Sequence, residues 1–391
     1  MVKPFQFSKL PQIWFGQGKI KIIPDLVKRY GNSIILVTGQ RSFSESRHFS
    51  ELSDSLKKNN ILSRSVTIQG EPSPTFIDNT VEAFRAEKID VIVAIGGGST
   101  MDAGKAISAM LPVAGKIIQY LEGVGDADHP GTKIPLIAVP TTSGTGSEAT
   151  KNAVISEVGK FGFKRSLRHD NFVPDIALVD PDLTVSCPAD LTAASGMDCF
   201  TQLVEAFLSD KACDYTDALA LKGIRAVAAS LEKAYKDGSD TGARSSMAFA
   251  SLTSGICLAN AGLGVVHGFA SSVGGRFDIP HGIICGTLMA VSNEITVRKL
   301  IHGEGESSFL HKYARLGEML MGESGKSDNF YISWFIDYLH HLSYELKLPG
   351  LKKAGMTEDS FEEICALTEN KNNPVKLTKE EMIEILSRRF L

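Results

Sequence analysis

Short apolar runs alternate with helical patterns along the first half of the chain. Continuous apolar runs, typical of strands buried on both faces of a parallel sheet, occupy residues 34–38, 91–98, 135–142 and 176–181. Candidate helices lie between them, for example at residues 44–58 and 76–88. This alternation predicts a doubly wound α/β domain. A hairpin formed by "PFQFS" and "QIWFGQG" is expected to lead into it.

The pattern changes near "DPDLTVSCPADLTAASG". From Pro188 onward there is no strand pattern, and long helical patterns follow at residues 190–208, 214–236, 242–260, 281–299, 307–321, 328–345 and 378–389. We therefore predict an α/β domain over residues 1–187 and an all-helical domain over residues 188–391. Ligands of open α/β sheets bind at the carboxyl ends of the strands, so the cleft between that edge and the helical domain is the expected site.

Composition and charge restrict the class of protein. The 391 residues are 43% hydrophobic and 22% charged, which is typical of a soluble globular protein with two large domains. A net charge of -4 without clusters gives no reason to expect nucleic-acid or anionic-membrane binding. No run reaches transmembrane length, and the N-terminus lacks a signal-peptide core. Six scattered cysteines without a CxxC pair indicate reduced thiols and a cytoplasmic protein.

Two loops carry the pattern of a phosphate site. "GGGSTMDAGK" (96–105) follows an apolar strand and begins a helix, where free N–H groups and the helix dipole favour an anion. It is neither GxGxxG nor a Walker A loop, and an ordinary glycine-rich turn explains it equally well. "PTTSGTGSE" (140–148) follows the next apolar strand with five hydroxyl side chains around two glycines. Together the two loops predict a pyrophosphate cradle.

A third strand end bears on the choice of cofactor. Many dinucleotide folds place an acid here to hold the ribose hydroxyl. This chain has Gly39, Gln40, Arg41 and Ser42 instead, which could hold a 2′-phosphate. This favours NADP over NAD, although a solvated surface arginine also explains Arg41.

Polar residues in apolar surroundings suggest a metal site. Asp198 and Gln202 lie four residues apart on one face of the apolar stretch "GMDCFTQLVEAF". His267 and His281 stand in "GVVHGFASSVGGRFDIPHG", each followed by glycine. One carboxylate and two imidazoles suit Zn²⁺ or Fe²⁺, and Gln202 could add a neutral oxygen. The alternative is a helix-capping Asp198 with two buried, hydrogen-bonded histidines.

The combination of motifs resembles one family end to end. "GGGSTMDAGK", "PTTSGTGSE", "PDIALVDP", "ASGMDCFTQLVEAF", "HGFASSVGGRFDIPHG" and "NNPVKLTKEEMIEIL" are together similar to the iron-containing (group III) alcohol dehydrogenases. The resemblance implies the two-domain fold of dehydroquinate synthase-like proteins, a dimer or larger homo-oligomer, and NAD or NADP binding. The cofactor residues it implies are Gly96, Gly97, Gly98, Ser99, Asp102, Thr141, Thr142 and Thr145. It matches Asp198, His267 and His281 to family metal ligands.

Two positions depart from the family pattern. The family helix usually reads D-x-x-x-H, and Gln202 stands at the histidine position. The family segment usually reads H-G-x-x-H, and Ser271 stands where a second histidine lies beside nicotinamide and substrate in relatives. Gln202 can still coordinate through its carbonyl oxygen, as a harder and weaker donor than imidazole. Ser271 removes a proton-relay group and leaves the general acid unassigned.

The resemblance predicts reversible hydride transfer between NAD(P)H and the carbonyl carbon of an aldehyde or ketone, with Fe or Zn as Lewis acid. Three alternatives stay open. One is a lyase resembling dehydroquinate synthase. A second is a dehydrogenase with an oxygenated or sugar-like substrate, and a third is a nucleotide-binding relative that has lost catalysis.

Overall fold

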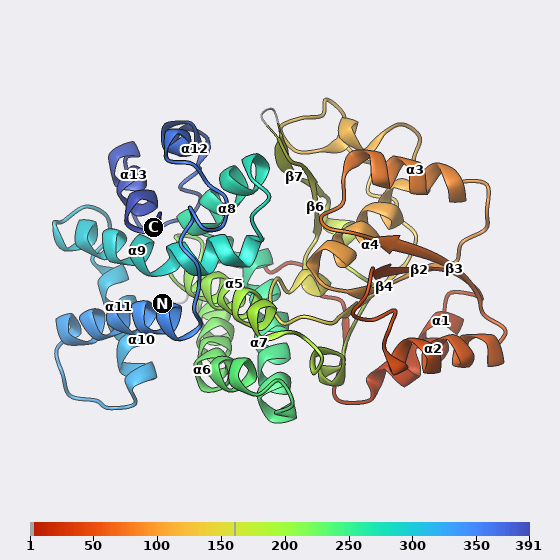
Figure 1. Ribbon diagram of the computed structural model, residues 1–391, viewed down its shortest axis with the longest axis horizontal. Helices are drawn as coiled ribbons and strands as arrows, with labels where there is room; N and C mark the ends of the chain where they lie inside the picture. The colour runs from red at the N-terminus through yellow and green to blue at the C-terminus, as the bar shows by residue number, and fades with distance from the viewer. Residues whose placement is uncertain (1–3, 160–161) are drawn as a thin grey trace.

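The computed structural model describes residues 4–159 and 162–391. Within these residues a six-stranded sheet forms one half and helices form the other (Figure 1). The strands are β1 Gln12–Phe15, β2 Ser33–Gly39, β3 Leu62–Ile68, β4 Val91–Gly96, β5 Leu136–Pro140, β6 Asn152–Glu157, β7 Phe163–Arg168 and β8 Ile176–Val179. The helices are α1 Ile23–Lys28, α2 Arg47–Lys58, α3 Pro74–Phe84, α4 Gly98–Met110, α5 Ala189–Phe207, α6 Asp214–Lys236, α7 Thr241–Ala261, α8 Val265–Arg276, α9 His281–Ile301, α10 Ser308–Met321, α11 Asp328–Glu345, α12 Phe361–Leu367 and α13 Lys379–Arg388.

The large sheet is entirely parallel, in the order β1-β8-β5-β4-β2-β3. Alternate residues of its strands face two separate cores, as side chains on a pleated sheet must. Ile34 and Leu36 of β2 pack with α1 and α2, whereas Ile35 and Val37 pack with α3 and α4. The predicted doubly wound α/β half is therefore confirmed.

The register of the sheet gathers the predicted cofactor loops. β4 lies between β2 and β5, with Gly96 opposite Pro140 and Ile95 opposite Thr38. The three strands run parallel, so their carboxyl ends meet at one edge. The segments that follow residues 39, 96 and 140 consequently begin side by side, which is the usual place for a ligand of such a sheet.

The expected opening hairpin is wrong. The described residues 4–10 contain no strand, and β1 pairs in parallel with β8. The chain also holds an antiparallel hairpin of β6 and β7 that the apolar pattern did not predict. Strand β3 was missed as well, because its residues alternate between buried and exposed positions at the edge of the sheet.

Helices alone make up the second half among the residues described after β8, as predicted. Helix α5 packs against α6, α7 and α9 (Figure 1). No single described helix is long and apolar enough to cross a membrane. Helices α7 and α8 reach that length and apolarity only together, and they are bent by 99° at the break between them.

Candidate metal centre and cofactor loops

Helix α5 carries the polar face on which the metal centre is built. Asp198, Gln202 and Glu205 follow one another at helical spacing, and all three are buried. The rest of the helix is held in an apolar core by residues such as Phe200 and Leu203. Three polar side chains in such a setting need partners, because a buried polar group without one is costly.

A close approach of two helices places His281 beside Asp198. Helix α9 begins at His281, and a Cβ atom on the next residue, Gly282, would lie 2.3 Å from the carbonyl oxygen of Ala194 on α5. Only glycine leaves room for this approach. As a result His281 Nε2 lies 3.6 Å from Asp198 Oδ1.

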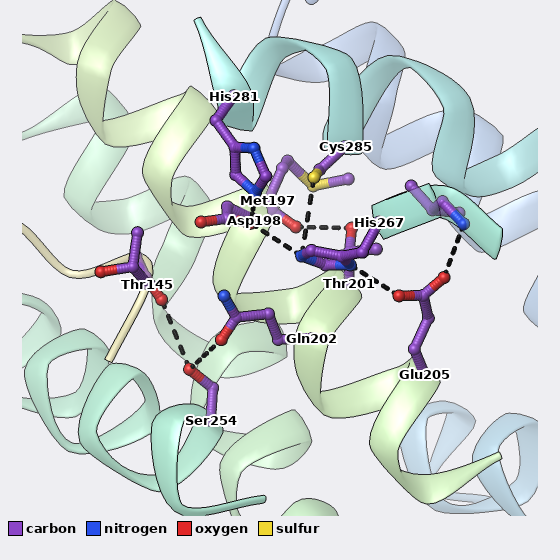
Figure 2. A network of polar contacts seen from close by, with 12 residues as sticks. Thr145, Met197, Asp198, Thr201, Gln202, Glu205, Ser254, His267, His281 and Cys285 are labelled. Atoms are coloured by element: carbon purple, nitrogen blue, oxygen red, sulfur yellow. Dashed lines mark hydrogen bonds and ion pairs between the residues drawn. The ribbon is translucent and has the colours of Figure 1, made fainter. Parts of the chain in front are cut away.

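Helix α8 brings the second imidazole to the same carboxylate. His267 Nε2 lies 3.2 Å from Asp198 Oδ1 and 3.7 Å from Cys285 Sγ. Asp198, His267, His281 and Cys285 point toward one another in Figure 2, and their donor atoms all lie within 4.8 Å of one another. The fold thus brings Asp198, His267 and His281 together, and it adds the thiol of Cys285.

Glu205 fixes the orientation of His267. The Nδ1–H of His267 donates to Glu205 Oε2 at 2.6 Å (Figure 2). The Val266 N–H donates to Glu205 Oε1 at 2.8 Å. The second nitrogen of the ring is then left to face Asp198. A carboxylate behind a histidine is the common arrangement around protein-bound metals, where it sets the tautomer and strengthens the donor.

The electrostatics of the cluster favour a bound cation. Burial would raise the pKa of Asp198, but His281 and His267 hold it below its usual value. Burial opposes charge on His267, yet Cys285, Glu205 and Asp198 raise its pKa well above the ordinary value. Burial lowers the pKa of His281 to about 4, which keeps that imidazole neutral. The carboxylates of Asp198 and Glu205 thus favour positive charge around His267, and the neutral His281 has a free lone pair beside them. Both properties suit a divalent metal.

Gln202 and Ser271, the two departures from the family pattern, each make a hydrogen bond. The carbonyl oxygen of Gln202 accepts a hydrogen bond from Ser254 Oγ at 3.0 Å (Figure 2). Ser271 Oγ donates to the carbonyl oxygen of His267 at 3.0 Å, within the same helix. The hydroxyl of Ser271 is therefore engaged by the backbone, and the amide of Gln202 is engaged by α7.

The glycine loop and the threonine loop pack against each other. A Cβ atom on Gly97 would lie 3.4 Å from Thr142 Oγ1, and one on Gly98 would lie 2.9 Å from Thr145 Cγ2. Gly97 is the N-cap of α4, whose first N–H groups have no partner inside the helix. A narrow backbone surface beside hydroxyl groups at a helix start is compatible with the pyrophosphate cradle, which stays a prediction. Ser99 and Thr141 lie in the same two segments.

Asp102 is anchored to both loops by a buried network. Its Oδ1 accepts from Ser147 Oγ at 2.7 Å and lies 3.5 Å from Lys105 Nζ. Lys105 also donates to Ser147 Oγ at 2.6 Å and to Thr150 Oγ1 at 2.9 Å. Lys105 is only 1% exposed, so this cation acts inside the fold and ties α4 to the threonine loop.

The third predicted cofactor segment lies at the same edge. A Cβ atom on Gly39 would lie 3.6 Å from Thr100 Oγ1, next to the glycine loop. Gln40 donates from its amide to Gln69 at 3.1 Å, and Arg41 is exposed. The carboxyl end of β2 is thus followed by an exposed arginine.

The threonine loop also contacts helices of the second half, including the one that carries Asp198. A Cβ atom on Gly144 would lie 2.9 Å from Ser195 Cβ, one turn before Asp198 on α5. One on Gly146 would lie 2.3 Å from the carbonyl oxygen of Ser251 on α7. The loop that would hold the cofactor therefore packs directly on the helix that supplies Asp198.

Glu148, at the end of the threonine loop, should make stability fall as pH rises. Burial raises its pKa to about 7, and its Oε1 has no hydrogen-bond partner among the described residues. Because the folded pKa lies above the unfolded one, stability is complete below the unfolded value and is lost as pH rises through the folded value. Glutamine does not ionise, so Glu148→Gln should escape this loss. Between pH 4.5 and pH 8, the free energy of unfolding of the natural protein should fall by about 3 kcal/mol more than that of the variant. Urea unfolding of both cofactor-free proteins at the two pH values measures this difference, and equal pH dependence would contradict it.

Comparison with known proteins identifies the family of the chain. The iron-containing alcohol dehydrogenase family model matches residues 11–181, and the model of the family's C-terminal part matches residues 192–390. The chain belongs to the iron-containing alcohol dehydrogenase family. It is 30% identical to alcohol dehydrogenase 4 of Saccharomyces cerevisiae, covering 97% of each chain. It is 31% identical to the NAD-dependent methanol dehydrogenase of Bacillus methanolicus, over 96% of this chain and 97% of that one.

Solved structures agree with the family assignment. A crystal structure of 1,3-propanediol oxidoreductase superimposes with a TM-score of 0.88 at 29% identity, covering 99% of this chain and all of the other. This iron-containing alcohol dehydrogenase is thus an alcohol oxidoreductase, as the sequence predicted. Both the α/β half and the helical half have their counterparts in that relative.

Two residues of the dehydrogenase site were missed from the sequence. Glu205 lies seven residues after Asp198, and Cys285 lies four residues after His281. The helical spacing that linked Asp198 to Gln202 could have found Glu205, because all three are polar residues on one helix face. It could not have found Cys285, because cysteine is a common buried apolar residue. Their contacts with His267, on a third helix, appear only in the fold.

Proposed function

We propose that this alcohol dehydrogenase catalyses reversible hydride transfer between a nicotinamide cofactor and the carbon of a small alcohol or aldehyde, assisted by one divalent metal. The observation that carries the proposal is the convergence of Asp198, His267 and His281 on one point, beside the helix turn on which the threonine loop packs. The buried Nδ1 of His281, which has no partner among the described residues, supports it, since a bound cofactor or water would satisfy that atom.

The bound groups supply the chemistry that side chains lack. A divalent cation in this site contributes Lewis acidity, which polarises a carbonyl and stabilises alkoxide charge, and the nicotinamide contributes the hydride. Asp198, His267 and His281 would hold the cation, and Glu205 keeps His267 in the tautomer that leaves Nε2 free.

Residues of the α/β half position the cofactor. The N–H groups at the start of α4 and the hydroxyls of Thr142 and Thr145 would bind the pyrophosphate. Asp102, fixed by Ser147, holds its carboxylate close to both loops. Because the two halves meet at the threonine loop, the bound hydride donor and the metal ligands would be held in a fixed relation, which lowers the entropic cost of reaching the transition state.

The proton follows a separate route. Ser271 is engaged with the His267 carbonyl and is poorly placed to relay a proton. We infer that the proton passes through water or the ribose hydroxyls of the cofactor. Substituting Ser271 by alanine would therefore leave the main proton route in place.

The test combines metal analysis with a substrate screen. Purified protein is analysed for Fe and Zn, and a panel of alcohols and aldehydes is assayed with NAD(H) and NADP(H). We expect stoichiometric metal and cofactor turnover that chelation abolishes and added metal restores. Turnover that persists after complete removal of metal would refute the metal-assisted reaction. Cofactor that binds without any turnover would instead favour a nucleotide-binding relative that has lost catalysis.

Arg41 should decide part of the cofactor preference. We propose that NADP is preferred, because an exposed arginine and no acid stand at the carboxyl end of β2. A charge-assisted hydrogen bond to a 2′-phosphate is worth about 1.5–3 kcal/mol, so Arg41→Ala should lower kcat/KM for NADPH by roughly 10- to 150-fold. The value for NADH, measured in parallel, should change little. An equal loss with both cofactors would show that Arg41 does not read the 2′ position.

A further inference from the structure

Cys285 stands where a metal ligand would stand, although nothing in its sequence context indicates one. It lies one turn after His281 on α9, and these two positions share a helix face. The side chain is fully buried, and its sulfur faces His267 Nε2 at 3.7 Å. His267 Nε2 is the same atom that faces Asp198, so the sulfur and the carboxylate oxygen share a neighbour.

Three separations between the donor atoms are close to those between ligands of a single ion. Bonds of about 2.05 Å to nitrogen or oxygen and about 2.3 Å to sulfur put tetrahedral neighbours about 3.3 Å apart for two N/O atoms, and about 3.6 Å apart when one is sulfur. The structure has 3.2 Å between His267 and Asp198, 3.6 Å between His281 and Asp198, and 3.7 Å between Cys285 and His267. All four donor atoms lie within 4.8 Å of one another.

We propose that the Cys285 thiolate is a fourth protein ligand of the metal, beside Asp198, His267 and His281. This inference rests on the proposed metal-assisted function and specifies the donor set of that same site. On binding, the S–H bond of Cys285 breaks, the proton passes to water, and a sulfur–metal bond forms without any change of oxidation state.

Gln202 is the competing fourth donor. It lies one turn from Asp198 on α5, but its carbonyl oxygen is directed to Ser254 Oγ at 3.0 Å. Ser254 also approaches the carbonyl oxygen of Gly144, in the threonine loop, at 3.3 Å. This geometry gives Gln202 a place in the link between α5, α7 and the cofactor loop, and leaves the fourth position to sulfur.

A thiolate changes which ions the site prefers. Two imidazole nitrogens, one carboxylate oxygen and one sulfur form a softer donor set than nitrogen and oxygen alone. Such a set favours Zn²⁺, Fe²⁺ or Co²⁺ over Mg²⁺ and Mn²⁺. Four protein ligands still permit catalysis, since a zinc-type centre can expand to five-coordinate.

The experiment uses Co²⁺ as a spectroscopic probe of the full-length, metal-stripped protein. Thiolate bound to Co²⁺ gives a charge-transfer absorption in the near ultraviolet that nitrogen and oxygen ligands do not give. We expect this band in the natural protein and in Gln202→Ala, and its loss in Cys285→Ser and Cys285→Ala. Loss of the ligand should also weaken Co²⁺ binding by at least about tenfold, since even partners behind the ligands cost about 10- to 100-fold.

Matched variants separate coordination from misfolding. Cys257 is as deeply buried as Cys285, but its thiol contacts the carbonyl oxygen of Thr216 on α6, so Cys257→Ser should keep both the band and the affinity. Retained NADPH binding shows that the Cys285 variants are folded. A band that persists in Cys285→Ser, or Co²⁺ bound in a His267-dependent way without any band, overturns the sulfur ligand and leaves the proposed function standing. Failure of the natural protein to bind Co²⁺, Zn²⁺ or Fe²⁺ at all overturns both.

Discussion

His267→Ala is expected to abolish both metal binding and alcohol oxidation. The imidazole is buried, touches Asp198 and Cys285 through Nε2, and is oriented by Glu205 through Nδ1. Its removal leaves Asp198 with one imidazole fewer and leaves Glu205 Oε2 without its partner beside a cavity. Lewis-acid stabilisation is worth several kcal/mol, so loss of the ion should lower kcat/KM by at least about a thousandfold. Metal analysis and steady-state kinetics on the same preparation measure the two effects together.

Two further substitutions should lower metal affinity to different extents. Asp198→Asn keeps the shape of the side chain and removes its charge, and we expect a loss of metal similar to that of His267→Ala. Glu205→Gln keeps His267 as a ligand but weakens its orientation, so metal affinity should fall by only about 10- to 100-fold. NADPH binding should be preserved in all three, because Glu205 and both ligands lie in the helical half. Full activity of His267→Ala after thorough chelation would exclude a metal-centred reaction.

The long elements of the fold were predictable because each carries its own periodic signal. Helix α6 was predicted with its exact bounds, since its apolar positions repeat over 23 residues and Lys236 is followed by a helix-ending segment. Strand β3 was not, because "LSRSVTI" mixes polar and apolar residues at a sheet edge. The expected hairpin failed for a different reason. "PFQFS" is apolar enough for a strand, but β1 finds its partner in β8, more than 160 residues away, and no local pattern carries that information.

Each position of the site was predictable only as far as its own stretch of sequence could reveal it. Asp198 stands out because an acid in an apolar helix needs a partner, and the glycines after His267 and His281 mark crowded positions. The pairing of Glu205 with His267 joins residues 62 positions apart, and that of Cys285 with His267 joins residues 18 apart on another helix. Cysteine is a common buried apolar residue, so Cys285 carries no signal until the fold places its sulfur among the donors.

Gly98→Val is expected to weaken cofactor binding without loss of metal. A Cβ atom at this position would lie 2.9 Å from Cγ2 and 3.1 Å from Oγ1 of Thr145, closer than ordinary van der Waals contact. The branched side chain must push the threonine loop away from the start of α4, and it covers the first N–H groups of that helix. Each lost hydrogen bond to a charged phosphate is worth about 1.5–3 kcal/mol, so the Kd for NADPH should rise at least about tenfold if one is lost and at least about a hundredfold if two are lost.

Gly97→Ala provides the graded comparison for this change. A Cβ atom there would make only an ordinary contact, 3.4 Å from Thr142 Oγ1, so the two loops can stay together and the rise in Kd should be smaller. Titration of NADPH fluorescence measures both variants, and metal analysis should show the same content as the natural protein, since Asp198, His267 and His281 are untouched. Unchanged NADPH affinity in a folded Gly98→Val protein would mean that the pyrophosphate lies elsewhere. If Gly98→Val lost its metal along with its cofactor, the contact of the threonine loop with α5 would be the cause, because Gly144 packs on Ser195 one turn before Asp198.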